Sequence, residues 1–248
     1  MFYCCGITEQ GNTPHNEDAF LINRQVMTSD GCEVTIDAPF IAAVSDGVSG
    51  ERSGEVASEM CLGLVGEIHY NSRMNLEQRL LEVHRSLADY SSEKLEIHNM
   101  QATLCGIAID ENSDIISFNV GDSRLYRFRR GRAEQISRDQ SLVQLLYDEG
   151  TITLEQKRTH VHRNIIFPVF GNLNAPPKVD IVSIDGGLYY GDVLMLCTDG
   201  LSDYLSPLDM EEIMELSKSL PERLKLLVKK ALDCGSKDNI TIIAVCRV

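Results

Sequence analysis

Apolar segments that end in an Asp-Gly pair constrain this sequence more than any other feature. The run Phe40–Ser45 is apolar and β-compatible, and it stops at Asp46-Gly47. The run Val193–Thr198 repeats the pattern and stops at Asp199-Gly200. A buried strand holds a carboxylate at its end rigidly, and the following glycine lets the backbone turn sharply and approach a ligand closely. We therefore expect buried strands whose acidic ends carry chemistry.

Three more acidic positions lie at the ends of predicted strands. They are Gly121-Asp122 after an apolar run, Glu17-Asp18 before one, and Asp238 before Ile240–Val245. One strand-end aspartate is usually a turn former. Acids at several matching strand ends instead predict a shared acidic pocket, and like charges so close together need cations to hold them.

The order of predicted elements indicates an α+β fold. Strands come first, then two helices, more strands, two more helices and a last strand. The predicted strands are Phe2–Thr8, Ala19–Thr28, Cys32–Ile36, Phe40–Ser45, Gln101–Asp110, Asp114–Val120, Arg124–Arg129, Ala133–Ser137, Val179–Ile184, Val193–Cys197 and Ile240–Val248. Four helices are predicted. The first begins at Ser53 and the second at Asn75, and the other two span Pro207–Leu216 and Pro221–Asp233. This order predicts two packed sheets with helix pairs outside, and 248 residues suit one domain, residues 1–248.

Residues 138–174 are less regular than the rest of the chain. A short helix is predicted over Ser141–Glu149, and Thr153 can cap another. A stretch punctuated by Pro and Asn follows, which is typical of a lid or recognition flap rather than of core.

Charge and composition exclude several kinds of partner. The formal net charge of −14 disfavours nucleic acid and anionic membranes as general partners. The sequence has no apolar run of about 18 residues, which a membrane span would need. The eight cysteines are scattered without CxxC spacing, and several, such as Cys61, Cys105 and Cys197, lie in apolar runs. We expect reduced thiols in the core of a cytoplasmic, monomeric protein.

Four arginines cluster around Gly131, namely Arg127, Arg129, Arg130 and Arg132. Two interpretations are open for this cluster. It is either a solvated hairpin tip or a docking patch for acidic or phosphorylated partners.

The ligand types in the acidic pocket predict which metal it binds. The pocket offers carboxylates and a glycine carbonyl, without a His or Cys cluster at ligand spacing, which favours Mg²⁺ or Mn²⁺ over zinc. Two such ions bridged by one aspartate can activate a water and neutralise a phosphoryl group. The sequence lacks GxSxG, a P-loop lysine motif and Cys-x5-Arg, so it does not indicate a covalent nucleophile.

Seven motifs in a fixed order carry a resemblance to a known family. They are Asn16-Glu17-Asp18, Ser45-Asp46-Gly47, Gly54-Glu55-Val56-Ala57-Ser58, Asn119-Val120-Gly121-Asp122-Ser123-Arg124, His160 with Arg163-Asn164, Thr198-Asp199-Gly200-Leu201-Ser202-Asp203, and Ser236-Lys237-Asp238-Asn239-Ile240-Thr241. From about residue 6 to 246, the chain resembles the metal-dependent protein phosphatases (PPM, type 2C) in their compact bacterial form.

The resemblance implies an α-β-β-α sandwich of two mostly antiparallel sheets flanked by helix pairs, with a binuclear Mn²⁺ or Mg²⁺ centre. It implies that Asp46 bridges both ions, that the Gly47 carbonyl is a ligand, and that Asp199 and Asp238 bind one ion. Glu17 and Asp18 act on the other side, directly or through water. Asp122 and Asp203 match positions that bind a third ion in bacterial relatives; the alternative is that they only cap turns. Residues 138–174 match the flap that shapes substrate access.

Two departures from the family pattern concern substrate binding. The arginine that clamps the substrate phosphate is replaced by Thr13, and the turn Val48–Glu51 lacks the histidine proposed as a general acid. Thr13, His160 and Arg163 are therefore candidates for substrate contact. His160 and His162 are either donors to the leaving group or plain flap surface.

The implied activity is a serine/threonine phosphoprotein phosphatase, in which metal-activated water attacks the phosphoryl group without a covalent intermediate. Asp18, Asp46, Asp199 and Asp238 would be catalytic, and the partners would be phosphoproteins and a cognate Ser/Thr kinase. Two alternatives stay open: a non-catalytic phosphoprotein-binding module, and a metal hydrolase of small phosphoesters, which the missing arginine permits.

Overall fold

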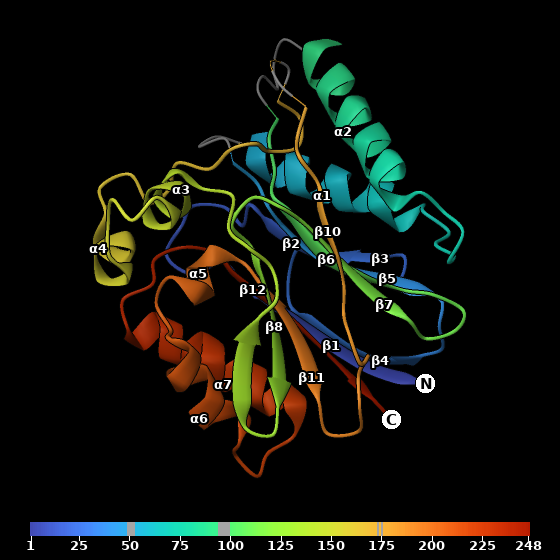
Figure 1. The fold of residues 1–248 in the computed structure, drawn as a ribbon, viewed down its shortest axis with the longest axis vertical. Coiled ribbons are helices and arrows are strands. Elements are labelled where there is room, and N and C mark those ends of the chain that lie inside the picture. Colours follow the sequence, from blue (N-terminus) through green and yellow to red (C-terminus); the bar gives the residue numbers. More distant parts are fainter. Residues whose placement is uncertain (49–52, 94–99, 173, 175) are drawn as a thin grey trace.

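Two six-stranded sheets packed face to face form the centre of the protein (Figure 1). The structure is a computed structural model, and it describes residues 1–48, 53–93, 100–172, 174 and 176–248. All neighbouring strand pairs are antiparallel. The α+β sandwich expected from the sequence is therefore confirmed.

The first sheet joins the two ends of the chain. Its strand order is β4 (Gly31–Ile36), β1 (Phe2–Glu9), β12 (Ile240–Arg247), β11 (Val193–Cys197), β8 (Arg124–Arg129) and β9 (Arg132–Gln135). Strand β1 pairs with β12 along its whole length, from Phe2 opposite Arg247 to Glu9 opposite Ile240. This pairing brings Asp238 next to the loop that follows β1.

The second sheet carries the first acidic motifs. Its order is β10 (Asp180–Ser183), β7 (Ile115–Val120), β6 (Leu104–Ile109), β5 (Phe40–Asp46), β2 (Asp18–Ile22) and β3 (Gln25–Met27). Strands β2 and β5 are paired so that Asp18 lies opposite Asp46.

Alternation of side chains in the central strands builds separate cores on the two faces of each sheet. In β5, Ala42 and Val44 point into the core between the sheets, whereas Ile41 and Ala43 point to the outer helices. Strand β5 is buried on both faces, which explains why its sequence is a continuous apolar run rather than an alternating one.

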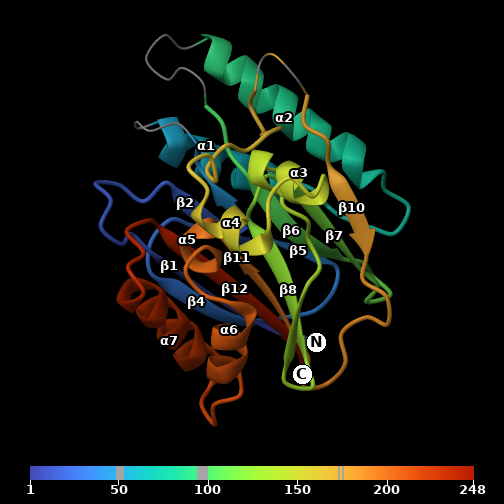
Figure 2. The ribbon, with the colours of Figure 1, turned by 60° about the vertical axis from the view of Figure 1, so that its left-hand side comes forward.

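Helices cover the outer face of each sheet (Figures 1 and 2). The pair α1 (Ser53–Gly66) and α2 (Leu76–Glu93) packs on the second sheet. Helices α6 (Pro207–Met214) and α7 (Leu220–Asp233) pack on the first sheet, together with the one-turn helix α5 (Asp199–Ser202). None of the helices in the described ranges combines the length and apolar character needed to cross a bilayer.

The predicted flap contains two short helices beside the sandwich, α3 (Leu142–Asp148) and α4 (Leu154–Thr159). The predicted cap at Thr153 is confirmed, since it forms a capping box with Gln156. Ser141, predicted as the first residue of its helix, is the N-cap and accepts from the Gln144 N–H. Both residues have extended backbones, and the side-chain oxygen of each satisfies a helix N–H group.

Two sequence-based predictions of local structure were wrong. The predicted strand Ala19–Thr28 is a hairpin of β2 and β3, because Asn23 adopts a positive φ of 59° that reverses the chain. Helix α5 was not predicted at all. This helix begins with the Asp199-Gly200 motif. The segment forms one helical turn after β11 instead of an open loop.

Candidate metal centre

The predicted acidic residues gather where β2, β5 and β11 have their acidic ends and where β12 begins. Asp18 begins β2 and Asp46 ends β5, directly opposite each other. Asp199 opens α5 immediately after β11 and Thr198, and Asp238 lies two residues before β12. Both sheets therefore contribute carboxylates to one region, as the strand-end pattern predicts.

Electrostatic coupling shows that these carboxylates share one environment. Burial raises the pKa of Asp46 well above its usual range, and repulsion from Asp199 and Asp18 raises it further. Burial and then repulsion from Asp122 and Asp203 similarly raise the pKa of Asp199. Burial is also the main cause that raises the pKa of Asp18 to about 7. Positive charge near these carboxylates would stabilise their ionised forms.

Exposure rises across the acidic cluster, from a buried carboxylate to an exposed rim. Asp18 is only 1% exposed. Asp46, Asp122 and Asp199 are partly exposed, while Asp203 and Asp238 are exposed. A charged substrate group can therefore reach the more exposed carboxylates from solvent.

Asp18 is held by hydroxyl groups from the other sheet. Thr198 Oγ1 donates to Asp18 Oδ2 at 2.8 Å and accepts from the Thr241 N–H at 3.0 Å. Thr241 Oγ1 in turn lies 2.7 Å from Thr8 Oγ1. These threonines fix the carboxylate across the interface between the sheets. Sequence reasoning missed Thr198, whose only signal is its place before Asp199.

Thr103 fixes Asp46 through hydrogen bonds to its backbone. Its Oγ1 accepts from the Asp46 N–H at 3.0 Å, and its own N–H donates to the Asp46 carbonyl at 2.8 Å. The Thr103 hydroxyl also lies 2.8 Å from that of Ser123, the residue after Asp122. One buried side chain thus ties two acidic turns together, and no sequence motif marks it.

Glycine at position 47 is required by close packing. A Cβ atom there would lie 2.0 Å from the Gly54 carbonyl oxygen, and a Cβ at Gly54 would lie 2.7 Å from Glu17 Cδ. The Gly47 N–H donates to the Glu17 carbonyl at 3.1 Å. Glu17, Gly47 and Gly54 are therefore in contact, which brings the start of α1 against the acidic pocket. The turn without a histidine continues into residues 49–51, which lie outside the described residues.

Asn239 organises the loop that carries Thr13. Its side-chain oxygen accepts from the Glu17 N–H at 2.8 Å, and its Nδ2 donates to Thr13 Oγ1 at 2.6 Å. The Thr13 hydroxyl donates to the carbonyls of Gln10 and His15. Asn239 is thus a structural hydrogen-bonding residue. The Thr13 hydroxyl is engaged by this loop network itself.

Residues of the flap clamp the turn at Asp122. Gln140 N–H donates to the Gly121 carbonyl at 2.8 Å, and Gln140 Oε1 accepts from the Gly121 N–H at 3.1 Å. Gly121 has a positive φ of 105°, which favours glycine at this turn. Burial and then repulsion from Asp139 raise the pKa of Asp122 to about 7.

A buried ion-pair network anchors the flap to β8. Arg124 donates to both Asp139 oxygens, at 2.9 and 2.7 Å, and to the Ser202 carbonyl at 3.1 Å. Lys157 of α4 adds a 2.9 Å contact to Asp139. Burial opposes the charge on Asp139, yet Arg124 and Lys157 together lower its pKa. Arg124 therefore joins β8 to the flap and to α5.

The other flap candidates lie on the rim. Arg163 Nε is 3.6 Å from Asp203 Oδ2, across a hollow of about 220 Å³ that Asp122, Lys157 and Ser202 also line. His160 accepts from the His162 N–H through Nδ1, so neutral His160 carries its proton on Nε2. Arg163 is therefore brought to the acidic cluster through Asp203, whereas on the flap His162 is exposed and His160 is half-buried.

The donor chemistry of the cluster fits hard divalent cations. Every candidate ligand is a carboxylate or a backbone carbonyl, which Mg²⁺ and Mn²⁺ prefer, and their mutual repulsion creates the need for positive charge. Within the described residues, no group of three His, Cys, Asp or Glu side chains is arranged to hold an ion as it stands. The fit rests on the ligand types and their shared environment.

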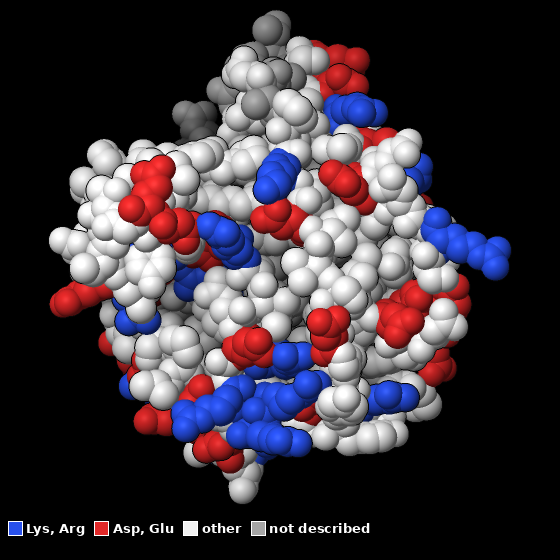
Figure 3. Space-filling model, viewed as in Figure 1, with Lys and Arg blue, Asp and Glu red and all other residues white. Residues whose placement is uncertain are grey.

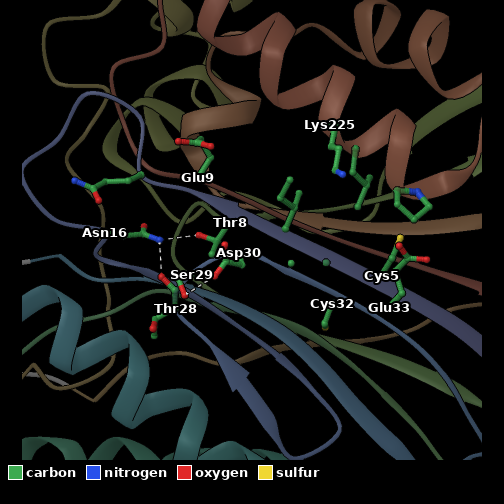
Figure 4. A pocket seen from close by; sticks show the side chains of 16 residues that line it. Cys5, Thr8, Glu9, Asn16, Thr28, Ser29, Asp30, Cys32, Glu33 and Lys225 are labelled. Atoms are coloured by element: carbon green, nitrogen blue, oxygen red, sulfur yellow. Dashed lines mark hydrogen bonds between the residues drawn. The ribbon is translucent and has the colours of Figure 1, made fainter.

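A larger hollow, of about 630 Å³, lies on the other side of loop 10–16, between β1, β4 and α7 (Figure 4). Asn16 crosses its end, with Nδ2 donating to Thr8 Oγ1 and the Thr28 carbonyl, both at 2.9 Å. None of the predicted site residues lines this hollow. We therefore assign the chemistry to the acidic cluster rather than to the larger cavity.

Known proteins share both the sequence pattern and the fold. A family model described as protein phosphatase 2C matches residues 14–234. A serine/threonine phosphatase stp of Listeria monocytogenes is 32% identical over 214 residues, which are 83% of each chain. The solved structure of the S. agalactiae serine/threonine phosphatase covers 100% of both chains with a TM-score of 0.85 and 26% identity. The catalytic domain of the phosphatase PstP, solved with 2 manganese ions, shares the fold with a TM-score of 0.78 at 24% identity.

Proposed function

This chain belongs to the protein phosphatase 2C family, and from this membership we infer that it removes phosphate from phosphoserine and phosphothreonine in proteins in a metal-dependent reaction. The observation that carries the inference is the cluster of coupled carboxylates at the strand ends, in the order that the family motifs require. Relatives named as serine/threonine phosphatases support the substrate class.

We assign the metal ligands as Glu17, Asp18, Asp46, the Gly47 carbonyl, Asp199 and Asp238, with Asp122 and Asp203 for a third ion. When bound, Mn²⁺ or Mg²⁺ would supply the Lewis acidity that makes water nucleophilic and neutralises phosphoryl charge. The chain itself positions these ligands. Thr198 orients Asp18, and Thr103 fixes the backbone of Asp46.

The rim residues act on substrate rather than on the metal in this assignment. Arg163 is a cation held beside Asp203, within reach of an incoming phosphate. His160 is half-buried, and its Nε2–H can donate a hydrogen bond to a leaving group beside the flap. Thr13 stands in this assignment where a charged arginine would bind two phosphate oxygens, and its own hydroxyl is bonded to Gln10, His15 and Asn239.

The proposal is tested by phosphate release from a phosphothreonine peptide with added Mn²⁺. We expect turnover with metal, none after chelation, and none for Asp46→Asn in the presence of metal. A small phosphomonoester is the comparison substrate. Binding of the peptide without turnover would favour the non-catalytic module, and turnover of only the small ester would favour the phosphoester hydrolase.

We further propose that the protein works in the cytoplasm as a monomer with one domain, and that it opposes a Ser/Thr kinase. All eight cysteines are free, as a reducing compartment requires. The flap over residues 138–174 would be a subregion of that domain, since the Asp139 ion pairs join it to β8.

A further inference from the structure

Arginine and tyrosine side chains gather at the end of the molecule opposite the acidic cluster. We call this surface the Arg–Tyr face, and it consists of Arg129, Arg130, Arg132, Tyr189, Tyr190 and Arg247. Strand β8 runs from Arg124, beside the acidic cluster, to Arg129 on this face, a length of roughly 17 Å. Figure 3 shows Lys and Arg side chains concentrated at the lower end of the molecule, where Figure 1 places the β8–β9 hairpin. This basic surface contrasts with the chain as a whole, which has a net charge of −14.

A buried carboxylate holds the aromatic part of this face in place. Asp192, which is 5% exposed, accepts from Arg129 Nε at 2.9 Å, from Arg129 Nη2 at 2.6 Å and from the Tyr189 N–H at 2.9 Å. Arg129 also donates to the Gly187 carbonyl and lies 4.6 Å from the centre of the Tyr189 ring. The charge of Arg129 is thus used internally, to fix the loop that presents the tyrosines.

The tyrosines themselves remain available to a partner. Tyr189 is 58% exposed and Tyr190 is 75% exposed, and they line an open hollow of about 540 Å³ with Arg130. Arg247 lies 5.7 Å from the centre of the Tyr190 ring. Tyr and Arg side chains dominate the binding energy of many protein interfaces, and a fixed loop lowers the entropy lost on binding.

Charge pairing on this face is incomplete. Arg132 pairs with Glu211, and Glu215 lies against Gly131 in the hairpin turn. Within the described parts of the chain, neither Arg130 nor Arg247 has a carboxylate partner. Two exposed guanidinium groups beside two exposed rings form a surface that complements carboxylates on a partner.

We propose that the Arg–Tyr face docks an acidic segment of a protein partner. Carboxylates of the segment would contact Arg130 and Arg247, and its backbone and apolar groups would lie on Tyr189 and Tyr190. Docking here is separate from the acidic cluster, so the proposal does not depend on the proposed phosphatase activity. The net charge of −14 disfavours non-specific binding of an acidic peptide, so binding that depends on Arg130 and Arg247 would identify this face.

The test uses a fluorescein-labelled peptide of 12 residues, rich in Asp and Glu with one central Leu, and a matched peptide with Asn and Gln in their place. Fluorescence anisotropy of the full chain should show saturable binding of the acidic peptide at low salt, weaker binding at high salt, and none for the amide peptide. Arg130→Gln, Arg247→Gln and Tyr190→Ala should each weaken binding roughly tenfold, as expected for loss of one charged or aromatic anchor.

Lys229→Gln is the matched control, because Lys229 is an exposed cation in the half of α7 that leads to Ser236, whose hydroxyl donates to the Gly200 carbonyl beside the acidic cluster. It changes net charge by the same amount and should leave binding unchanged. Thermal unfolding and turnover of a small phosphoester should be the same in all of these variants. Failure of the acidic peptide to bind, or equal weakening by Lys229→Gln, would overturn the proposal and leave the arginines as a solvated hairpin tip.

Discussion

The hydroxyl of Thr198 donates a 2.8 Å hydrogen bond to the buried carboxylate of Asp18, 180 residues earlier in the chain. Thr198→Val keeps the side-chain volume but leaves Asp18 and the Thr241 N–H each without this partner. We expect a loss of about 1–3 kcal/mol in the free energy of unfolding, measured in urea with chelator. The Mn²⁺ concentration for half-maximal activity should also rise. Thr151→Val, at an exposed position, is the control and should change neither quantity.

Asp46→Asn and Asp199→Asn should lower kcat by orders of magnitude, since each removes a ligand charge from the centre. The metal-free variants should unfold at the same temperature as wild type or higher, because repulsion among the carboxylates is relieved. Steady-state kinetics with saturating Mn²⁺ and thermal melts with chelator measure the two effects. Near-normal turnover in either variant would refute the ligand assignment.

The metal-free protein should become more stable as the pH falls from 8 to 6. Burial is the main reason that the folded pKa of Asp18 and Asp122 is raised to about 7, compared with about 3.9 in an unfolded chain. The folded state therefore binds more protons than the unfolded state in this range, and each such group contributes up to about 1.4 kcal/mol per pH unit.

Urea unfolding at the two pH values, with chelator, measures this slope. Asp18→Asn should make it shallower, because one of the carboxyl groups with a raised pKa is removed. With excess Mn²⁺ the direction should reverse, since protons compete with the ion for the same carboxylates. Stability that falls between pH 8 and pH 6 in chelator would contradict the prediction.

Asp139→Asn should destabilise the protein by about 3–5 kcal/mol, because Arg124 would then keep its charge in a buried site without a carboxylate partner. The flap should also become more sensitive to protease than the sheets. Asp148→Asn removes an exposed ion pair with Arg138 in the same flap and should cost less than about 1 kcal/mol. Equal effects of the two substitutions would show that the buried network does not anchor the flap.

Thr13→Arg tests whether position 13 faces the substrate phosphate. The substitution also removes the hydroxyl that Asn239 contacts, so Thr13→Ala is the matched control for that loss. If the new guanidinium reaches the phosphate, KM for a small phosphoester should be roughly tenfold lower in Thr13→Arg than in Thr13→Ala, at unchanged metal affinity. The same KM in both variants would place the phosphate elsewhere.

The sequence was sufficient to predict most of the strands and the acidic cluster. Runs such as Phe40–Ser45 are apolar because both faces are buried, and glycine follows Asp46 because Gly54 leaves no room for a Cβ atom. In both cases a requirement of the folded structure leaves a pattern that is visible in a short stretch of sequence. The hairpin at Asn23 was missed because an asparagine with positive φ is compatible with several backbone conformations and has no fixed signature.

The supporting residues of the site could not be predicted in the same way. Thr103 and Thr198 are single hydroxyl residues in apolar surroundings, and their partners lie on other strands. Gln140 and Asp139 lie in the flap. Their side chains bond to Gly121, which follows β7, and to Arg124 of β8. Only the three-dimensional pairing of distant segments makes these residues functional, so a pattern read along the chain does not reveal them.

The pairing of β1 with β12 has a consequence for how the chain reaches its native state. Thr8 and Thr241, whose hydroxyls are in contact, are separated by 233 positions, so the pairing of β1 with β12 joins segments from nearly opposite ends of the sequence. Contacts of such high sequence separation slow folding, because loop entropy is lost before the contacts form. During synthesis, β1 has to wait for β12 to leave the ribosome. Asp238 precedes β12, and β12 lies between β1 and β11, so the first sheet and the acidic cluster are both completed only when β12 has paired with its two neighbours.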